Sequence, residues 1–312
     1  MAGMDEACLA FATGSGRDAW AMWRNMILAL GALVLTGADR PRDFVVRGDG
    51  VVPAQIGGRP ARLLLSPWAP AAPTLNPGFV RAIGLHAGLF GFAVKVGPVK
   101  VRGDTSVTRL DYSGASGRRR VVWFERDYAQ NADAAVGPGG MPAEVIRFEL
   151  RPPKGDERVT VLPLVQNMFR PSYARVMLGK RPIILLFDPQ HSRSLATAGA
   201  GAALAEFLGG ALQGPPRPAP VAFGIMRPAR TLRFGRPLQF GNIRLDEVLV
   251  RISDNGSVAG VKDDDADPEE VVVSAKSKSE RRDVVIIGQD VLGSCASFTF
   301  DKPARQIRLA CA

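Results

Sequence analysis

The sequence predicts an all-β chain built from two equivalent lobes, and three observations support this fold class. Residues 57–67 recur as residues 179–189, with Gly, Arg, Pro, two leucines and the final Pro identical. Later in each half, two apolar residues precede a glycine, at Gly137 and at Gly288. Short β-branched or aromatic runs bounded by turn residues fill the intervals, and no long helical period follows residue 38. This ordered repeat indicates that one structural unit occurs twice.

Size and composition agree with two folded lobes. A chain of 312 residues is long enough for two domains of ordinary size, each with its own core. Hydrophobic residues make up 46% and charged residues 22%, which are usual proportions for a globular protein. The 34 glycines and 24 prolines are scattered, as a fold with many tight turns requires. A collagen-like or low-complexity chain is therefore excluded.

Flanking segments repeat in the same order as the two copies. A strand-like run precedes each copy, at residues 51–56 and 173–178, and a short helix candidate follows each, at residues 78–85 and 202–208. Further strands are predicted at residues 121–124, 159–162, 248–252 and 271–273. We therefore expect each half to consist mainly of short strands.

The spacing of the repeat locates the lobes and their insertions. The first segments lie 122 positions apart and the later glycines 151 positions apart, so the second half carries about 29 more residues. We assign these to the Pro-rich residues 214–220 and the acidic residues 262–270. A polar, Pro-rich stretch at residues 152–156 predicts the boundary between an N-terminal lobe, residues 39–155, and a C-terminal lobe, residues 156–312.

The N-terminal residues 1–38 predict a leader that contains a signal peptide. From Met22, Arg24 precedes an apolar run at residues 26–35, and small residues follow to Ala38. The apolar run is shorter than the roughly 20 residues that span a bilayer. We expect export to the periplasm or the cell exterior, with no integral span after leader removal; an uncleaved anchor or a buried helix is the alternative. The sequence leaves the start codon open among Met1, Met4 and Met22.

Cysteine usage is compatible with export. Cys8 would be lost with the leader, which leaves Cys295 and Cys311. These two flank a predicted β-hairpin with a Pro-containing turn, so they fall nearly opposite each other. A disulfide is expected there. Two free, half-buried thiols are the alternative.

The order of the repeated segments resembles the pepsin and retropepsin superfamily of aspartic peptidases, in its single-chain, two-lobed form. In that family each half has an apolar strand, an Asp-Thr/Ser-Gly triplet, and a later apolar-apolar-Gly that completes a loop crossing itself around the aspartate. The resemblance covers nearly all of residues 45–312. It implies an aspartic-protease-like fold of two pseudo-twofold-related β-barrel lobes with a central cleft. It also implies a site where two carboxylates about 3 Å apart share one proton.

This chain departs from the family's site at both aspartate positions and around them. Ser66 follows the apolar residues 63–65 where the first aspartate is expected, and Asp188 follows residues 185–187 at the second. A serine hydroxyl cannot act as a carboxylate base. The remaining changes place proline at the hydroxyl position and a larger residue at the glycine position of both triplets: Pro67, Trp68, Pro189 and Gln190.

These departures predict that the usual peptidase mechanism is lost. Removing one acid–base partner alone lowers a rate by roughly 10²–10⁴-fold. Asp188 is then either a hydrogen-bonded turn residue or a residual ligand group. His191 follows closely and is interpreted as a solvent-facing turn residue.

One further element of the family is expected on the N-terminal lobe. Pepsin-like enzymes carry a Tyr on a hairpin flap, roughly forty residues after the first aspartate. Here Tyr112 precedes a Gly/Ser-rich tip between two strand-like runs. An ordinary surface hairpin is the alternative. A surviving flap and cleft would hold an extended peptide by strand addition without cutting it.

Other chemistries find little support. The net charge is +10, but the cations are dispersed and not interleaved with aromatics, so no nucleic-acid partner is expected. The chain has only His86 and His191 and lacks a G-x-S-x-G motif. The acidic residues 263–270 lack the spacing of a Ca²⁺ loop, and we expect no metal or cofactor. The triplet at residues 104–106 is interpreted as a turn.

The sequence therefore favours a non-catalytic, exported protein that binds a peptide or protein through the inter-lobe cleft or a lobe surface. A divergent aspartic endopeptidase built on Asp188 and Ser66 is the competing hypothesis. A structural role with the cleft filled by Trp68 is the third. The ligand and the oligomeric state remain open from the sequence.

Overall fold

The computed structural model describes residues 43–312 except 90, 254–256, 259 and 265–282. The predicted leader, Cys8, the predicted strand 271–273 and most of the acidic loop lie outside the described residues. Among the described residues, no helix is both long and apolar enough to cross a membrane.

The N-terminal lobe is a seven-stranded sheet that closes on itself. Its strands, in sheet order, are β2 (Val51–Ile56), β3 (Arg59–Leu65), β8 (Ala134–Val136), β4 (Thr74–Leu75), β7 (Ala115–Phe124), β6 (Val99–Tyr112) and β5 (Gly91–Val96). An additional pairing of β2 with β6 closes the first six strands into a barrel. Strand β5 is left at the edge.

The C-terminal lobe repeats this order strand for strand. Its order is β11 (Arg170–Leu178), β12 (Arg181–Phe187), β18 (Val284–Ile287), β13 (Leu195–Ala196), β16 (Ile243–Arg251), β15 (Ile225–Phe240) and β14 (Gly210–Ala222), followed by β17 (Lys262–Asp263). In each lobe the strand that leads into the repeated turn pairs in parallel with the strand that ends just before the later glycine. These pairs are β3 with β8 and β12 with β18. The predicted repeat is therefore a repeat of topology.

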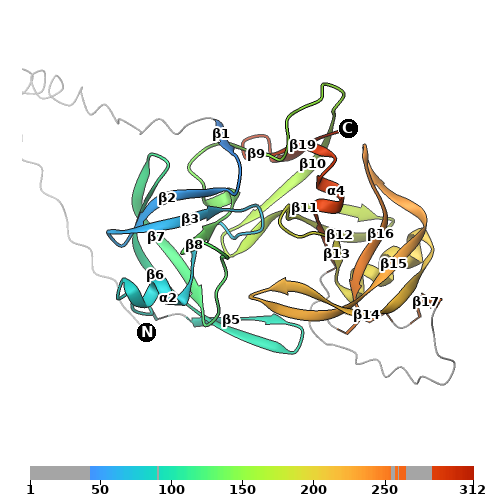
Figure 1. Cartoon of the computed structure of the whole chain (residues 1–312), viewed down its shortest axis with the longest axis horizontal. Coiled ribbons are helices and arrows are strands. Elements are labelled where there is room, and N and C mark those ends of the chain that lie inside the picture. The colour runs from blue at the N-terminus through green and yellow to red at the C-terminus, as the bar shows by residue number, and fades with distance from the viewer. Residues whose placement is uncertain (1–42, 90, 254–256, 259, 265–282) are drawn as a thin grey trace, which may run out of the picture. The chain divides into compact units, whose positions relative to one another are not determined.

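Five strands join the two lobes at the top of Figure 1. They are β1 (Asp43–Val46), β9 (Val145–Glu149), β19 (Cys295–Asp301), β20 (Gln306–Cys311) and β10 (Arg158–Asn167). At their centre β9 pairs antiparallel with β19, with Phe148 opposite Phe298. The two rings are stacked, with their centroids 4.9 Å apart and their planes inclined by 9°. Equivalent strands of the two halves thus pair with each other, as a pseudo-twofold relation requires.

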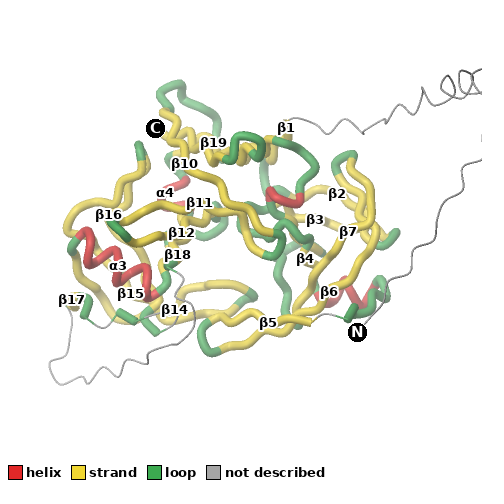
Figure 2. Tube along the Cα trace, turned by 180° about the vertical axis from the view of Figure 1, so that it is seen from behind, coloured by secondary structure: helices red, strands yellow, loops and turns green. Residues whose placement is uncertain are grey.

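Helices are short and occupy equivalent places. Helix α2 (Pro77–Ala82) follows β4, and α3 (Ala198–Leu208) follows β13 and lies beside β15 (Figure 2). The 3₁₀ helix η1 (Pro138–Gly140) follows β8, and α4 (Gln289–Leu292) follows β18. Thr197 caps α3 by accepting from the Ala200 N–H at 3.3 Å. The all-β, bilobal, aspartic-protease-like fold predicted from the repeat is confirmed by this topology.

Two segments differ locally from the prediction or extend it. Residues 104–106 are not a turn but lie within β6, paired with β7, because the flanking residues continue the strand alternation. The predicted insertion at residues 214–220 lies in β14, which has 13 residues where its counterpart β5 has 6.

Candidate functional site

The Ser66 and Asp188 turns have the same hydrogen bonds, one for one. The Ser66 N–H donates to Val136 O at 3.1 Å, and the Asp188 N–H donates to Ile287 O at 3.0 Å. The third residue of each turn donates its N–H to the first side chain, at 3.2 Å to Ser66 Oγ and 3.0 Å to Asp188 Oδ1. The next N–H donates to the first carbonyl, at 3.1 Å in both. These three hydrogen bonds therefore have the same pattern whether the first residue of the turn is serine or aspartate.

Gly137 and Gly288 lie where the returning strand passes the turn at very short range. A Cβ at Gly137 would lie 1.9 Å from Ala69 O, and one at Gly288 would lie 2.7 Å from His191 O. Ala69 and His191 are equivalent positions in the two turns. Any side chain would collide with backbone at either glycine, so the crossed loop requires both glycines.

The two turns lie on one cavity. Pro67 from the N-terminal lobe and Pro189 with Gln190 from the C-terminal lobe line a space of about 220 Å³. Phe148, from the strands that join the lobes, contributes to the same wall. The predicted meeting of two equivalent turns at the lobe interface is thus present, with two prolines where the family resemblance implies hydroxyl side chains.

Asp188 is the one carboxylate of these two turns. Burial raises its pKa above the ordinary aspartate value, while the Gln190 N–H and the neighbouring His191 act in the opposite direction. Ser66 is 5% exposed, and its Oγ accepts the Trp68 N–H. The pair therefore offers one proton-binding carboxyl group and one hydroxyl, which cannot share a proton as two carboxylates do.

His191 is buried, which corrects the expectation of a solvent-facing histidine. It is 9% exposed, with Nδ1 2.5 Å from Arg193 O and Nε2 2.9 Å from Pro220 O. Both partners are backbone carbonyl oxygens, so each ring nitrogen faces a hydrogen-bond acceptor. The ring connects the Asp188 turn to β14, a contact that sequence spacing could not reveal.

Tyr128 lies near Asp188 and is bonded to the backbone of Trp68. The Tyr128 hydroxyl donates to Trp68 O at 2.9 Å. Burial raises the pKa of Tyr128, and the nearby Asp188 carboxylate raises it further. The Trp68 side chain packs against a C-terminal-lobe cluster that includes Leu186 and Val221. Trp68 thus bridges the lobes at the position where the family resemblance implies glycine.

Asn76 holds Tyr128 in place. Its Oδ1 accepts the N–H groups of Tyr128 and Ala129 at 2.8 and 3.0 Å. Its Nδ2 donates to Ala129 O and Ala132 O at 2.7 and 2.9 Å. All four bonding positions of this 9% exposed amide are used. Neither Asn76 nor Tyr128 belongs to a repeated segment, so the sequence analysis missed both.

Two hairpins, one from each lobe, meet across the site. Phe223 at the tip of the β14–β15 hairpin lies 4.6 Å from Phe124 and 5.5 Å from Tyr128, measured between ring centroids. A Cβ at Gly97, the tip of β5–β6, would lie 2.6 Å from Arg227 Nε on β15. Both views place β5 beside β14 (Figures 1 and 2). The inter-lobe cleft is therefore covered on this side by the chain itself.

Tyr112, predicted on a flap, lies instead in the core of the N-terminal lobe. It is 4% exposed, and its hydroxyl donates to Gly140 O at 2.7 Å. Burial raises the pKa of Tyr112 to about 12. The predicted hairpin does form between β6 and β7, but the hairpin whose tip reaches the other lobe is β5–β6.

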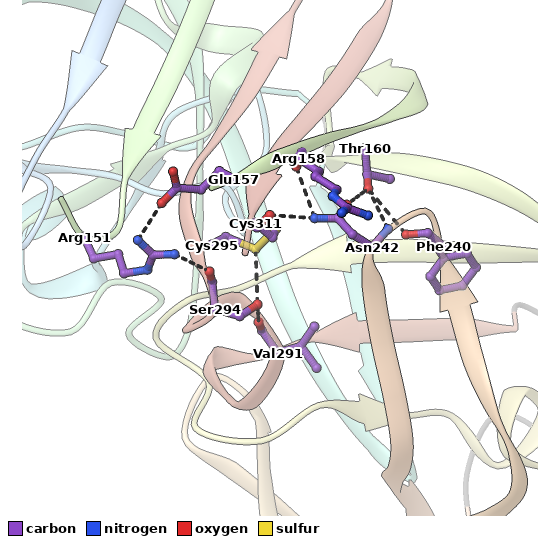
Figure 3. Close-up of a disulfide and its surroundings, with 10 residues drawn as sticks. All are labelled: Arg151, Glu157, Arg158, Thr160, Phe240, Asn242, Val291, Ser294, Cys295 and Cys311. Carbon is purple, nitrogen blue, oxygen red and sulfur yellow. Dashed lines mark hydrogen bonds and ion pairs between the residues drawn. A yellow bond between two sulfur atoms is a disulfide. The ribbon is translucent and has the colours of Figure 1, made fainter. Parts of the chain in front are cut away.

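Cys295 and Cys311 form a disulfide between β19 and β20 (Figure 3). Neighbouring polar groups converge on it. The Asn242 amide donates to Cys311 O at 2.6 Å, and the Arg151 guanidinium donates to Ser294 O at 2.6 Å. Arg151 also pairs with Glu157 at 2.8 Å. The disulfide thus lies where the segment between the lobes meets the last hairpin.

Among the residues that the structure describes, no three His, Cys, Asp or Glu side chains gather as a metal site would need. The Asp188 carboxylate lies within electrostatic range of His191 and Tyr128.

Comparisons with known proteins do not establish a family. No protein-family model and no curated protein matches the chain. The structure is similar to the aspartic proteinase from Irpex lacteus, with a TM-score of 0.41, 11% identity, and coverage of 84% of this chain and 94% of that one. It is also similar to the EIAV protease complexed with the inhibitor HBY-793. That match has a TM-score of 0.23 and 14% identity, and it covers 30% of this chain and 84% of that one. Both scores are below 0.5, so the fold assignment rests on the strand order and the repeated turns.

Proposed function

We propose that this chain is an exported, non-catalytic protein of aspartic-protease-like fold that binds an extended peptide or protein segment. The observation that carries the proposal is the pair of equivalent turns with a single carboxylate. Their hydrogen bonds match one for one, yet the acidic group of the first turn is a serine hydroxyl. The turn structure is thus the same in both lobes, but only the second turn carries a carboxylate.

The loss of the second carboxylate removes the acid–base pair. Peptide hydrolysis on this scaffold needs one carboxylate to take a proton from water while the other, protonated, assists the carbonyl. Ser66 has too high a pKa to act as the base, and its Oγ already accepts an N–H. Beside this site Tyr128 donates a hydrogen bond to Trp68 O, and Trp68 packs against the C-terminal lobe.

The predicted leader and the disulfide support export. Structural disulfides persist in oxidising compartments and are rare in the cytosol. The Cys295–Cys311 pair belongs to the hairpin that joins the lobes, so its oxidation state bears on the stability of the described chain.

The peptide-binding part of the proposal follows from the sheet architecture. A bilobal β fold offers an inter-lobe cleft and exposed strand edges, and extended peptides bind to both by adding a strand. The tips of β5–β6 and β14–β15 pack on one another, so entry into the cleft requires these tips to separate.

A divergent endopeptidase is the alternative, and one observation favours it. Asp188 is a buried carboxyl with a raised pKa beside Tyr128 and His191, and perturbed titratable groups of this kind cluster at active sites. In that case Asp188 would act as the acid–base group, with Tyr128 or His191 as its partner.

Digestion of unfolded protein substrates separates the two functions. Wild type, Asp188→Asn and the matched control Asp127→Asn, an exposed aspartate, are incubated with reduced, alkylated protein from acid to mildly alkaline pH. We expect no cleavage by any of the three, together with measurable binding of extended peptides. Cleavage by wild type and by the control, but not by Asp188→Asn, would establish the endopeptidase instead.

A further inference from the structure

The two lobes treat their equivalent edge strands differently. In the C-terminal lobe, β17 pairs with β14 at Ala211 and Leu212. The rest of that edge carries four prolines, Pro215, Pro216, Pro218 and Pro220. Proline has no N–H and blunts a sheet edge. The equivalent strand β5 contains no proline, and no described strand pairs with its outer edge. One edge is closed to strand addition and its counterpart is open.

Register determines which backbone groups of β5 face outward. A two-residue turn, Gly97–Pro98, joins Val96 to its partner Val99. The pair that flanks such a turn is hydrogen-bonded within the hairpin, and bonded pairs then alternate with unbonded ones. The N–H and C=O groups of Lys95, Ala93 and Gly91 therefore point away from β6. An incoming strand would find three successive sets of free backbone groups.

The two faces of this edge differ in chemistry. On one face Lys95 lies directly opposite Lys100, and Ala93 lies opposite Arg102. All three cationic side chains are exposed, and none has an ion-pair partner among the residues that the structure describes. Like charges placed opposite each other on a sheet repel, so acidic side chains on a neighbouring strand would reduce the repulsion between these cations.

The other face of the edge is apolar. Phe92 packs edge-on against Phe124, with 5.2 Å between the ring centroids, and Val96 is buried in the cluster that holds Ile225 of the β14–β15 hairpin. Val94, between them, is 36% exposed. A side chain next to Val94 on an added strand would cover this apolar surface.

We propose that the outer edge of β5 binds an extended peptide by strand addition, with acidic side chains beside Lys95 and apolar side chains beside Val94. The inference rests on the proposed function, since it names the site and the peptide class for the same binding activity. It places that site on a lobe edge, so the closed hairpins need not open.

Synthetic peptides test the edge. A fluorescein-labelled ten-residue peptide of alternating Glu and Val is titrated with the full chain by fluorescence anisotropy, beside a matched peptide of alternating Lys and Val. We expect the acidic peptide to bind and the basic one not to bind. Ala93→Pro, which removes one outward N–H, should weaken binding by about tenfold or more, whereas Ala93→Ser, which keeps it, should not.

A charge exchange keeps the test decisive if the proline variant fails to fold. In Lys95→Glu/Lys100→Glu we expect the preference to reverse toward the Lys–Val peptide. Acidic-peptide binding that neither Ala93→Pro nor the charge exchange alters would overturn the β5 site and leave the proposed function standing. Absence of binding by both peptides would overturn the β5 site. Asp188-dependent digestion together with β5-dependent binding would overturn the non-catalytic function alone.

Discussion

The neighbours of the Asp188 carboxyl decide its charge. Burial raises the pKa of this carboxyl and is the largest effect, while the backbone N–H groups of Gln190 and His191 and the nearby His191 side chain lower it. At the equivalent position Ser66 carries no charge at any ordinary pH. The two turns therefore have matching backbone hydrogen bonds but contain a single acidic side chain.

Replacing Asp188 by asparagine should stabilise the protein at neutral pH. The folded-state pKa is raised, so the folded carboxyl binds its proton more tightly than the unfolded one, and ionisation costs folding stability. Asn keeps an acceptor for the Gln190 N–H. We expect a higher free energy of unfolding for Asp188→Asn at pH 7. The advantage should disappear below the ordinary aspartate pKa of about 3.9. Urea unfolding across pH measures this, and a less stable variant at pH 7 would contradict it.

A methyl group at Gly137 should be poorly tolerated. Its Cβ would lie 1.9 Å from Ala69 O, so backbone must move. We expect Gly137→Ala to lose about 3 kcal/mol or more of unfolding free energy. Gly117→Ala is the matched control, since a Cβ there meets nothing within 4 Å. It should be neutral or stabilising by about 0.5 kcal/mol. Equal effects in thermal unfolding would refute the crossed loop.

At the scale of elements, the order of strands shows which hairpin of one lobe is equivalent to which hairpin of the other. The β5–β6 hairpin corresponds to β14–β15, and the tips of these two meet across the site. The sequence predicted the turns, the glycines and most strands because these recur in both halves. It could not predict the tip contacts, the burial of His191 or the Asn76–Tyr128–Trp68 chain of hydrogen bonds. Each of these joins residues that lie outside the repeat or have no equivalent partner.

The last hairpin offers a test of its disulfide. Sixteen positions separate Cys295 from Cys311, and a closed loop of this size is worth about 3 kcal/mol in the chain-entropy model. Cys295→Ala/Cys311→Ala should lose about that much unfolding free energy under oxidising conditions. Under reducing conditions wild type should fall to the same level. A reductant-insensitive wild type would argue that the thiols stay free.

For the whole molecule, the two lobes are held together at several separate places. The paired strands β9 and β19 join them on one side of the turns, and Phe223, Phe124 and Tyr128 join them on the other. Trp68 lies between. A ligand that enters between the lobes on the hairpin side would have to separate these aromatic contacts.

Removing Phe223 should loosen only the hairpin side. We expect Phe223→Ala to increase hydrogen exchange at the tips of β5–β6 and β14–β15, because the aromatic contacts with Phe124 and Tyr128 are lost. Exchange in β9 and β19 should stay unchanged. A global rise in exchange would show that the hairpin contact is instead part of the main core.

The titration of Asp188, followed through its carboxyl carbon by NMR, tests the central claim most directly. A lone buried carboxylate should give one protonation step, displaced above the ordinary aspartate value. The variant Ser66→Asp should convert this into two coupled steps that belong to the pair. Two coupled steps already in the wild type, or a single step at or below the ordinary value, would contradict the account of a dyad reduced to one acid.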